Sequence, residues 1–350
     1  EAAHPRARFD NDTLKIAVKE YHFDKSTADA KYGPIAEWDV SSVTNMSFLF
    51  CNARGFKGDL SAWDVSRVTD MSSMFCGTRA FSCDLSKWDV SKVEDMGSMF
   101  MYALAFSCDL SKWDVAGVGD MNAMFCDAHN FESDLSEWNV SKVTKMDFMF
   151  CHARSFTGDL SAWNVSSVCQ TSWMFCGARA FDGDLSAWDV SRVTGMRRMF
   201  DEARAFNCDL GAWDVSSVTD MSYAFNHASA FNCDLSKWNV SSVTDMHAMF
   251  AYAIAFNSDL SAWDTSHVVD MGGMFCNTHD FNGDLSKWDV SSATKMDCMF
   301  WSARGFNGDL SKWDVRRVQS MNLIFHNAPT FGGRLSDAFV ARMHALGERR

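Results

Sequence analysis

Large apolar residues recur along this chain with a period of 25 residues. Phe occupies positions 50 and 56 and all their equivalents, and Leu recurs from position 60 onwards. Trp recurs at twelve equivalent positions: 38, 63, 88, 113, 138, 163, 188, 213, 238, 263, 288 and 313. The pattern predicts one stacked array of twelve coils rather than several domains, because a single coil cannot bury its own apolar face.

The spacing within one copy predicts a short strand followed by a short helix. Leu60, Trp63 and Val65 match the L-x-x-L-x-L core of a leucine-rich repeat, with Trp63 and Val65 on one strand face. Ser66 is a candidate N-cap for the helix. The helical stripe comprises Val68, Met71, Met74, Phe75 and Thr78. The sequence therefore predicts an α/β repeat, a right-handed leucine-rich-repeat-like solenoid with short parallel strands and short helices.

The N-terminal residues depart from the repeat and predict a helical cap over residues 1–33. Its helix is expected at about 12–22, with Asp12 or Thr13 as the N-cap. The apolar positions of this helix are Leu14, Val18 and Tyr21. Such a cap covers the core that the first coil would otherwise expose.

The solenoid is expected over residues 34–335, and residues 336–350 predict a C-terminal helical cap. Ser336 is its candidate N-cap, and the helix is expected at 336–346. An amphipathic membrane helix is the weaker interpretation for either cap, because the charges on both are of mixed sign.

The repeat string V-T-x-M-x-x-M-F-x-x-A-x-x-F-x-x-D-L-S-x-W-D-V-S extends over about residues 33–336. It resembles the 25-residue leucine-rich repeat of mycoplasma-type surface lipoproteins, which belong with BspA-like surface proteins. The segment LKIAVKEYHFDKSTADAKYGPIAEWDV is similar to the lead-in of eukaryotic, especially algal, members. The resemblance implies a surface-exposed adhesion or interaction module and does not identify its partner.

The chain is acidic, with a formal net charge of −13 and a pI of about 5.1. An acidic surface argues against binding to nucleic acids or to anionic membranes. No stretch approaches the roughly 20 apolar residues of a membrane span. Residues 1–12 lack the apolar segment of a signal peptide, so no targeting segment is visible.

Sequons nevertheless favour an extracellular or cell-surface location, with an organelle lumen as the alternative. N-x-S/T sequences begin at Asn11, Asn45, Asn139, Asn164 and Asn239. Three of them arise because WDVS became WNVS, so the repetition itself explains much of the count.

Catalysis needs unlike groups that converge at one place, and the sequence offers no such motif. The chain contains ten His, and His129 and His279, which share a column of the repeat, lie six coils apart. No phosphate-binding loop or nucleophile elbow is present. We therefore expect no enzymatic activity, no catalytic residues and no cofactor.

Two acidic columns run through the repeat. One contains Asp59, Asp84 and Asp109, and the other contains Asp64, Asp89 and, in place of Asp, Asn139. These oxygens could form a ladder of Ca²⁺ sites or accept backbone N–H groups in turns. We favour the structural interpretation because Asn replaces Asp in the second column, so an oxygen suffices there without charge.

Cysteines occur as two pairs in adjacent coils of one column: Cys83 with Cys108, and Cys208 with Cys233. Neighbouring coils bring equivalent Cα atoms within disulfide range, about 4.4–6.8 Å. We therefore consider both disulfides as candidates in an oxidising compartment. No C-x-x-C spacing points to a zinc site, and we expect no metal centre.

The best candidates for a binding surface are the places where the repeat fails. The segments MYALAF (101–106) and AYAIAF (251–256) replace the usual C-x-A-R-x-F and introduce apolar groups into a polar column. Trp also occurs twice outside its ladder. The candidate partner-binding residues are therefore Tyr102, Leu104, Tyr252, Ile254, Trp173 and Trp301.

We expect a non-enzymatic interaction scaffold or surface adhesion protein that binds other proteins through an extended solenoid face. The alternative is a structural or linker subunit of a large assembly, for example an organellar or photosynthetic one. Binding to cell-surface glycans and binding to ice are weaker hypotheses. The Thr ladder at position 44 is broken by other residues, which disfavours an ice-binding lattice.

Overall fold

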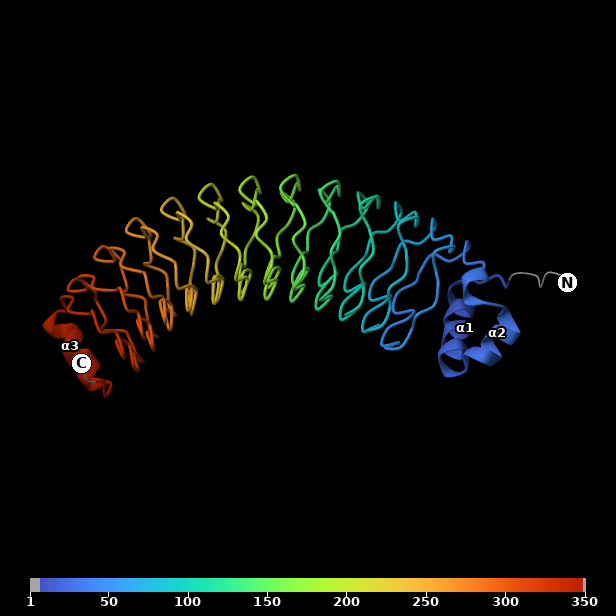
Figure 1. Ribbon diagram of the computed structural model, residues 1–350. Coiled ribbons are helices and arrows are strands. Elements are labelled where there is room, and N and C mark those ends of the chain that lie inside the picture. The colour runs from blue at the N-terminus through green and yellow to red at the C-terminus, as the bar shows by residue number, and fades with distance from the viewer. Residues whose placement is uncertain (1–6, 349–350) are drawn as a thin grey trace. The chain divides into compact units, whose positions relative to one another are not determined.

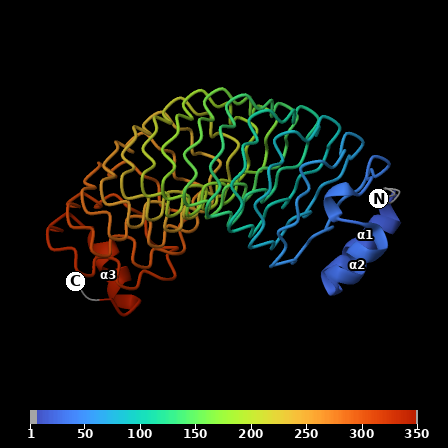
Figure 2. The same cartoon turned by 45° about the vertical axis from the view of Figure 1, so that its right-hand side comes forward.

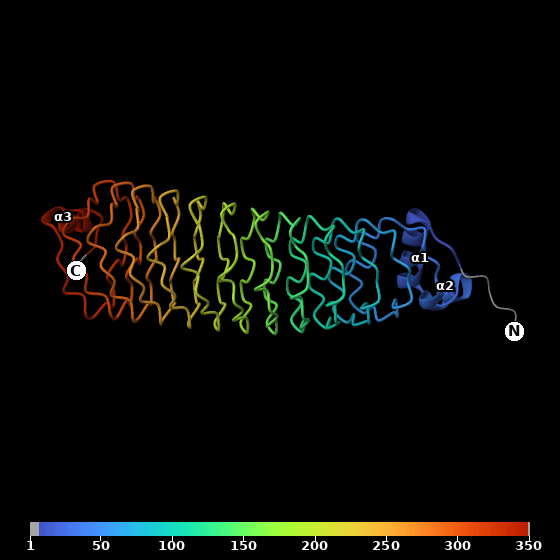
Figure 3. The ribbon, with the colours of Figure 1, turned by 90° about the horizontal axis from the view of Figure 1, so that it is seen from above.

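The computed structural model describes residues 7–348 and divides the chain into two compact units, which meet in sequence at residues 167 and 168. Within each unit the 25-residue repeats form coils that lie side by side in chain order (Figures 1 and 3). The prediction of a repeat solenoid is confirmed, and the hand of its winding stays a prediction.

The N-terminal cap contains two α-helices, α1 (Asn11–Phe23) and α2 (Lys25–Tyr32), followed by the 3-10 helix η1 (Ile35–Glu37) (Figure 2). The predicted helix over 12–22 corresponds to α1. Sequence analysis missed α2, because the only buried residue of α2 is Ala28 and no apolar stripe marks it. The first six residues of the predicted cap lie outside the described part of the chain.

The N-cap of α1 is Asp10, so the prediction of Asp12 or Thr13 is wrong. The Asp10 carboxylate accepts a hydrogen bond from the Thr13 backbone N–H at 2.9 Å, and the Thr13 hydroxyl accepts from the Asp10 N–H at 2.9 Å. This reciprocal pair satisfies two donors at the helix start. Leu14, Val18 and Tyr21 are buried, as the pattern predicts.

The C-terminal cap is α3 (Asp337–Ala345), which agrees with the helix predicted over 336–346. Ser336 is its N-cap and accepts a hydrogen bond from the Phe339 N–H at 3.1 Å. Phe339 and Met343 are buried against the last coils. Figure 2 shows α3 lying against the end of the stack within residues 168–350.

The strand predicted over residues 60–65 is wrong, because two β-turns occupy that region. The Trp63 N–H donates to the Leu60 carbonyl at 3.0 Å, and the Val68 N–H donates to the Val65 carbonyl at 2.9 Å. Within residues 7–348, β-pairing occurs as isolated parallel bridges, such as that between Asp70 and the next coil. The pairing therefore lies several residues after the predicted strand.

The helix predicted over residues 68–78 is also wrong, and a series of turns replaces it. Alternate N–H groups donate to carbonyls of the next coil, and the intervening ones donate to carbonyls three residues back. The donors to the next coil are Met71, Ser73, Phe75 and Gly77, at 2.7–3.0 Å. A helix would satisfy its N–H groups internally and leave none to join the coils.

Left-handed backbone at two fixed positions makes these turns possible. Residues at position 48 and its equivalents, and at position 52 and its equivalents, have positive φ in every coil. Phe48 has φ 59° and Asn52 has φ 62°. Each is the third residue of a β-turn, where a type II turn requires positive φ. Most of these residues are not glycine, and positive φ is unfavourable for a residue with a Cβ atom. We infer that contacts between coils offset this local strain.

Replacement of Ser98 by Gly should therefore stabilise the protein by about 0.5–1 kcal/mol, although glycine usually destabilises regular structure. Ser98 has φ 56°, and Gly273 occupies an equivalent position with φ 64°. Chemical denaturation would measure the change. Ser98→Val is the matched control and should destabilise, because a β-branched residue is strained at this φ. Equal destabilisation by both substitutions would contradict the prediction.

Aromatic columns form the core, as the hydrophobic pattern predicts. Trp263 is 3% exposed and stacks on Trp238 and Trp288, with ring centroids 6.5 and 6.3 Å apart. Its indole N–H donates to the Leu235 carbonyl at 3.0 Å. The Trp column thus both fills the core and joins each coil to the preceding one. Two further columns of stacked Phe run beside it.

Residues 168–350 also contain an asparagine ladder that sequence analysis missed. Each Asn side-chain oxygen accepts the backbone N–H of the equivalent residue in the next coil at 2.8–2.9 Å. The ladder comprises Asn207, Asn232, Asn257, Asn282 and Asn307. The equivalent positions of the first unit are Lys57, Ser82, Ser107, Glu132 and Thr157.

Candidate functional site

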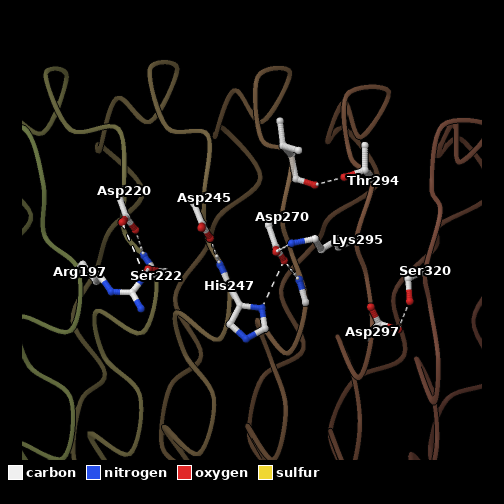
Figure 4. A network of polar contacts seen from close by, with 12 residues as sticks. Arg197, Asp220, Ser222, Asp245, His247, Asp270, Thr294, Lys295, Asp297 and Ser320 are labelled. Carbon is white, nitrogen blue, oxygen red and sulfur yellow. Dashed lines mark hydrogen bonds and ion pairs between the residues drawn. The ribbon is translucent and has the colours of Figure 1, made fainter.

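A row of aspartates follows the β-bridges in each unit, at position 45 of the repeat. Figure 4 shows the row of the second unit. The two rows comprise Asp70, Asp95 and Asp120, and Asp220, Asp245 and Asp270. Like charges on adjacent strands, about 4.8 Å apart, destabilise the array unless they are partnered. The surroundings of each carboxylate therefore matter.

Lysine terminates both rows. Lys145 Nζ lies 2.8 Å from Asp120 Oδ2, and Lys295 Nζ lies 2.9 Å from Asp270 Oδ2. The middle aspartates differ, since neither Asp95 nor Asp245 forms an ion pair with any described residue. Each unit thus presents a carboxylate that has acidic neighbours on both sides of the row.

The middle carboxylates are harder to ionise than ordinary aspartates. Burial raises the pKa of Asp95, and the charges of Asp120 and Asp70 raise it further, whereas the hydrogen bond from the Gly97 N–H and the charge of Lys145 lower it in part. Burial also raises the pKa of Asp245, together with Asp220 and Asp270, and the hydrogen bond from the His247 N–H partly opposes the rise. A cation placed beside either group would relieve this repulsion.

Asp270 shows the opposite shift. Burial raises its pKa, but hydrogen bonds from His247, Lys295 and the Gly272 N–H together outweigh burial and lower the pKa to about 2. His247 Nδ1 lies 3.3 Å from Asp270 Oδ1, on the side opposite Lys295 in Figure 4. Asp270 is therefore ionised and already partnered at neutral pH.

The predicted partner-binding residues lie just beyond these rows along each coil. Tyr102 is 42% exposed and Ile254 is 43% exposed, while Leu104 and Tyr252 are half-buried. We use the term turn face for the outward side chains at positions 45, 47, 48, 52 and 54 of the repeat, together with the partly exposed members of position 51, such as Trp301. On this face the exposed apolar groups stand among polar and charged ones.

Tyr252 and Trp301, which lie far apart in sequence, pack against the same small cluster. Its buried members are Ala248, Ala251 and Cys276, and Tyr223 also packs there. Tyr252 stacks on His227 with ring centroids 4.2 Å apart and an interplanar angle of 10°. The structure thus brings these two predicted residues onto one aromatic-rimmed surface.

Trp173 belongs to a different cluster of the second unit. The Arg198 guanidinium lies 4.5 Å from the Trp173 ring centroid and 4.1 Å from the Tyr223 ring centroid. Arg198 also forms an ion pair at 2.6 Å with Asp201, whose side chain is 4% exposed. Burial raises the pKa of Asp201, whereas Asn226 and Arg198 lower it. Trp173 is therefore half-buried by an organised polar cluster.

The aspartates and asparagines of the predicted ladders accept backbone N–H groups, as the structural interpretation predicts. Asp59 Oδ1 accepts from the Ser61 N–H at 2.9 Å, and Asp64 Oδ1 accepts from the Ser66 N–H at 3.1 Å. Asn139 makes the same contact without charge. The same contact is made by Asp84, Asp89 and Asp109. Ser66 is therefore a turn residue and not the predicted helix cap.

The predicted disulfides are not formed: Cys83, Cys108, Cys208 and Cys233 are free thiols. Each sulfur accepts the N–H of a Leu in the preceding coil, as Cys108 does from Leu85 at 3.2 Å. Ser133 fills the same role with its hydroxyl. Burial raises the pKa of Cys83 to about 11, which suppresses the thiolate that disulfide formation needs.

Sequence reasoning missed both the aspartate rows and the Arg198–Asp201 pair. The sequence does contain a signal for the rows, because position 45 of the repeat is Asp in three successive coils of each unit. The signal for the pair was weaker: two adjacent Arg at 197–198, and an Asp in a column where six other coils have Cys.

A family model described as a Mycoplasma protein of unknown function, DUF285, matches residues 20–138, 120–237, 180–272 and 220–339. The chain belongs to the DUF285 family. The overlapping matches to this DUF285 chain follow its repeats through both units, which agrees with the coils described above. No curated protein matches the chain at a significant level.

Among solved structures, the crystal structure of a TLR13–ssRNA13 complex matches the DUF285 chain at 12% sequence identity and a TM-score of 0.26. The match covers 80% of the DUF285 chain and 48% of the solved chain, so this chain spans about half the length of its match. A TM-score of this size does not establish a common fold. No described helix of the DUF285 chain is long and apolar enough to cross a membrane.

Proposed function

We propose that the protein is a non-enzymatic interaction scaffold or surface adhesion protein that binds other proteins through its turn face. The observation that carries this proposal is the exposure of apolar side chains on the turn face, with Tyr102 and Ile254 at the departures from the repeat. Phe48 and Leu323, both at position 48 of the repeat, are exposed on the same face. Solenoids offer extended, rigid surfaces, and exposed apolar groups with a polar rim are typical of protein contacts.

The same proposal has three further parts. The repeat is of the leucine-rich type, the protein is extracellular or on the cell surface, and it binds proteins rather than glycans. Membership of a Mycoplasma protein family favours a surface location. A structural or linker subunit of a large assembly would use the same face in a permanent contact. Neither function requires a catalytic residue or a cofactor.

Glycan binding is the second candidate, and the aromatic rim formed by Tyr223, Tyr252 and Trp301 favours it. Aromatic faces beside polar groups provide stacking surfaces for the C–H faces of sugar rings. A glycan array would reveal such binding directly. Signals that persist after Tyr252→Ser and Trp301→Ser would place any sugar site elsewhere.

Protein binding is tested with the double variant Tyr102→Ser and Leu104→Arg. The immobilised chain is incubated with an extract of its source cells, and bound partners are cross-linked to it. The double variant should capture at least tenfold less partner than the wild-type chain. Lys87→Ser with Lys112→Ser, at exposed positions of another column, is the control and should leave capture unchanged. If the test variant captured as much partner as the control variant, Tyr102 and Leu104 would be excluded from the interface.

A further inference from the structure

The departures from the repeat recur at a distance of 150 residues, which corresponds to six coils. The recurrence involves residues of different chemistry at several positions of the turn face. The recurring pairs are Tyr102 and Tyr252, Leu104 and Ile254, His129 and His279, Asp95 and Asp245, Asp120 and Asp270, and Lys145 and Lys295. One member of each pair lies in residues 1–167 and the other in residues 168–350.

The local geometry is repeated with the residues. The lysine–aspartate contacts measure 2.8 Å in the first unit and 2.9 Å in the second. Tyr102 has φ 58° and Tyr252 has φ 59°, and both donate their N–H to a cysteine carbonyl of the next coil at 2.7 Å. The two surfaces therefore share their backbone and the paired side chains. Neighbouring positions differ, since Gly97, Met101 and Cys151 of the first unit correspond to His247, Ala251 and Trp301 of the second.

A plain duplication of six coils would leave all columns equally similar, and they are not. Position 57 and its equivalents have diverged, since the first unit carries Lys57 and Glu132 where the second carries Asn207 and Asn282. The Cys at position 51 is Asp201 in the second unit. The residues of the recurring pairs have stayed alike on the same molecule, which indicates a shared role.

We propose that each unit carries one copy of the same peptide-binding site, so that one chain binds two copies of one partner segment. This inference rests on the proposed function as a protein scaffold. Each copy spans three coils, residues 95–104, 120–129 and 145–154 in the first unit, and residues 245–254, 270–279 and 295–304 in the second. The partner segment carries a Lys or Arg and an apolar side chain.

Charge complementarity identifies the cationic part of this segment. Asp95 and Asp245 each lie between two other aspartates and form no ion pair with a described residue, whereas the last Asp of each row is held by lysine. The chain as a whole has a net charge of −13, which attracts cationic segments. A Lys or Arg of the partner would complete the row.

The apolar part of the segment is fixed by the tyrosine and its aliphatic neighbour. Tyr102 lies seven residues after Asp95, a span of at most about 25 Å even if fully extended. A short peptide can therefore reach both the carboxylate and the apolar pair. Two such sites on one chain give a multivalent partner an effective concentration that one site lacks.

The test selects peptides on the full chain from a phage-displayed library of random 12-residue peptides. Binders to the quadruple variant Tyr102→Ser, Leu104→Arg, Tyr252→Ser, Ile254→Arg are removed. Isothermal titration of a selected synthetic peptide should give two equivalents per wild-type chain and one per chain for either double variant. The quadruple variant should bind at least tenfold more weakly, with an unchanged circular dichroism spectrum.

A second pair of variants, Asp95→Asn and Asp245→Asn, keeps the test valid if the apolar variants fail to fold. Each substitution should weaken peptide binding at its own site several-fold. The selected peptides should be enriched in Lys or Arg. If the wild-type chain bound only one equivalent of peptide, and if substitution of only one of the two apolar pairs abolished that binding, the duplication would be overturned. The proposed scaffold function would still stand. Failure to enrich any peptide over the quadruple variant would overturn both.

Discussion

Replacement of Trp263 by Ala should lower the free energy of unfolding by about 3–5 kcal/mol. The side chain is 3% exposed and stacks between Trp238 and Trp288, so truncation opens a cavity that the neighbouring rings cannot close. Because each coil contacts mainly its neighbours, the damage should concentrate near the substitution. Chemical denaturation and hydrogen exchange by mass spectrometry would measure the total and its location.

Trp263→Phe is the matched control for this core position. It keeps most of the aromatic volume but removes the indole N–H that donates to the Leu235 carbonyl. That carbonyl still accepts the Trp238 backbone N–H at 3.1 Å, so we expect a loss of only about 1 kcal/mol. An equal loss for Phe and Ala would mean that the hydrogen bond, and not the packing, holds the coils together.

Replacement of Arg198 by Ala should destabilise the protein by about 2–4 kcal/mol at neutral pH. The substitution leaves the Asp201 carboxylate, which is 4% exposed, without its cation, and an uncompensated buried charge is costly. It also removes the guanidinium from between Trp173 and Tyr223. Urea denaturation followed by circular dichroism would measure the loss, and a loss below about 0.5 kcal/mol would contradict the argument.

The loss in Arg198→Ala should shrink as the pH falls. Burial already raises the pKa of Asp201 above its ordinary value of 3.8, and removal of the arginine raises it further. A carboxyl whose pKa is raised in the folded state destabilises that state when ionised, so lowering the pH towards 3.8 restores stability. The double variant Arg198→Ala, Asp201→Asn should recover most of the loss at pH 7 and show no such pH dependence.

Fixed columns made the repeat array and its core predictable. Phe, Leu and Trp recur at one period without insertions, and no arrangement other than stacking buries them all. The two terminal helices were predictable because Val18 and Phe339 belong to apolar patterns that the coils do not share. Exposed apolar groups on the turn face were predictable from the failure of a polar column at Tyr102 and Ile254.

The local structure of the coil was not predictable from apolar spacing. Positions three or four apart mark a helix when one face is buried, but here the same spacing arises from successive turns. The deciding factor is the hydrogen bonding of alternate N–H groups to the next coil, as at Met71 and Ser73. Such long-range bonds leave no local signal, and left-handed residues such as Ser98 and Tyr102 share no side-chain type.

The sequence by itself determined the number of coils, the aromatic core, the capping at both ends and the places where the turn face departs from its pattern. The tertiary structure decided that the coil consists of turns, that the cysteines accept hydrogen bonds, and that Asp95 and Asp245 form no ion pair with a residue of the described part of the chain. The reason is that burial depends on which residues are apolar, whereas backbone bonding and charge pairing depend on what the neighbouring coil places opposite each group.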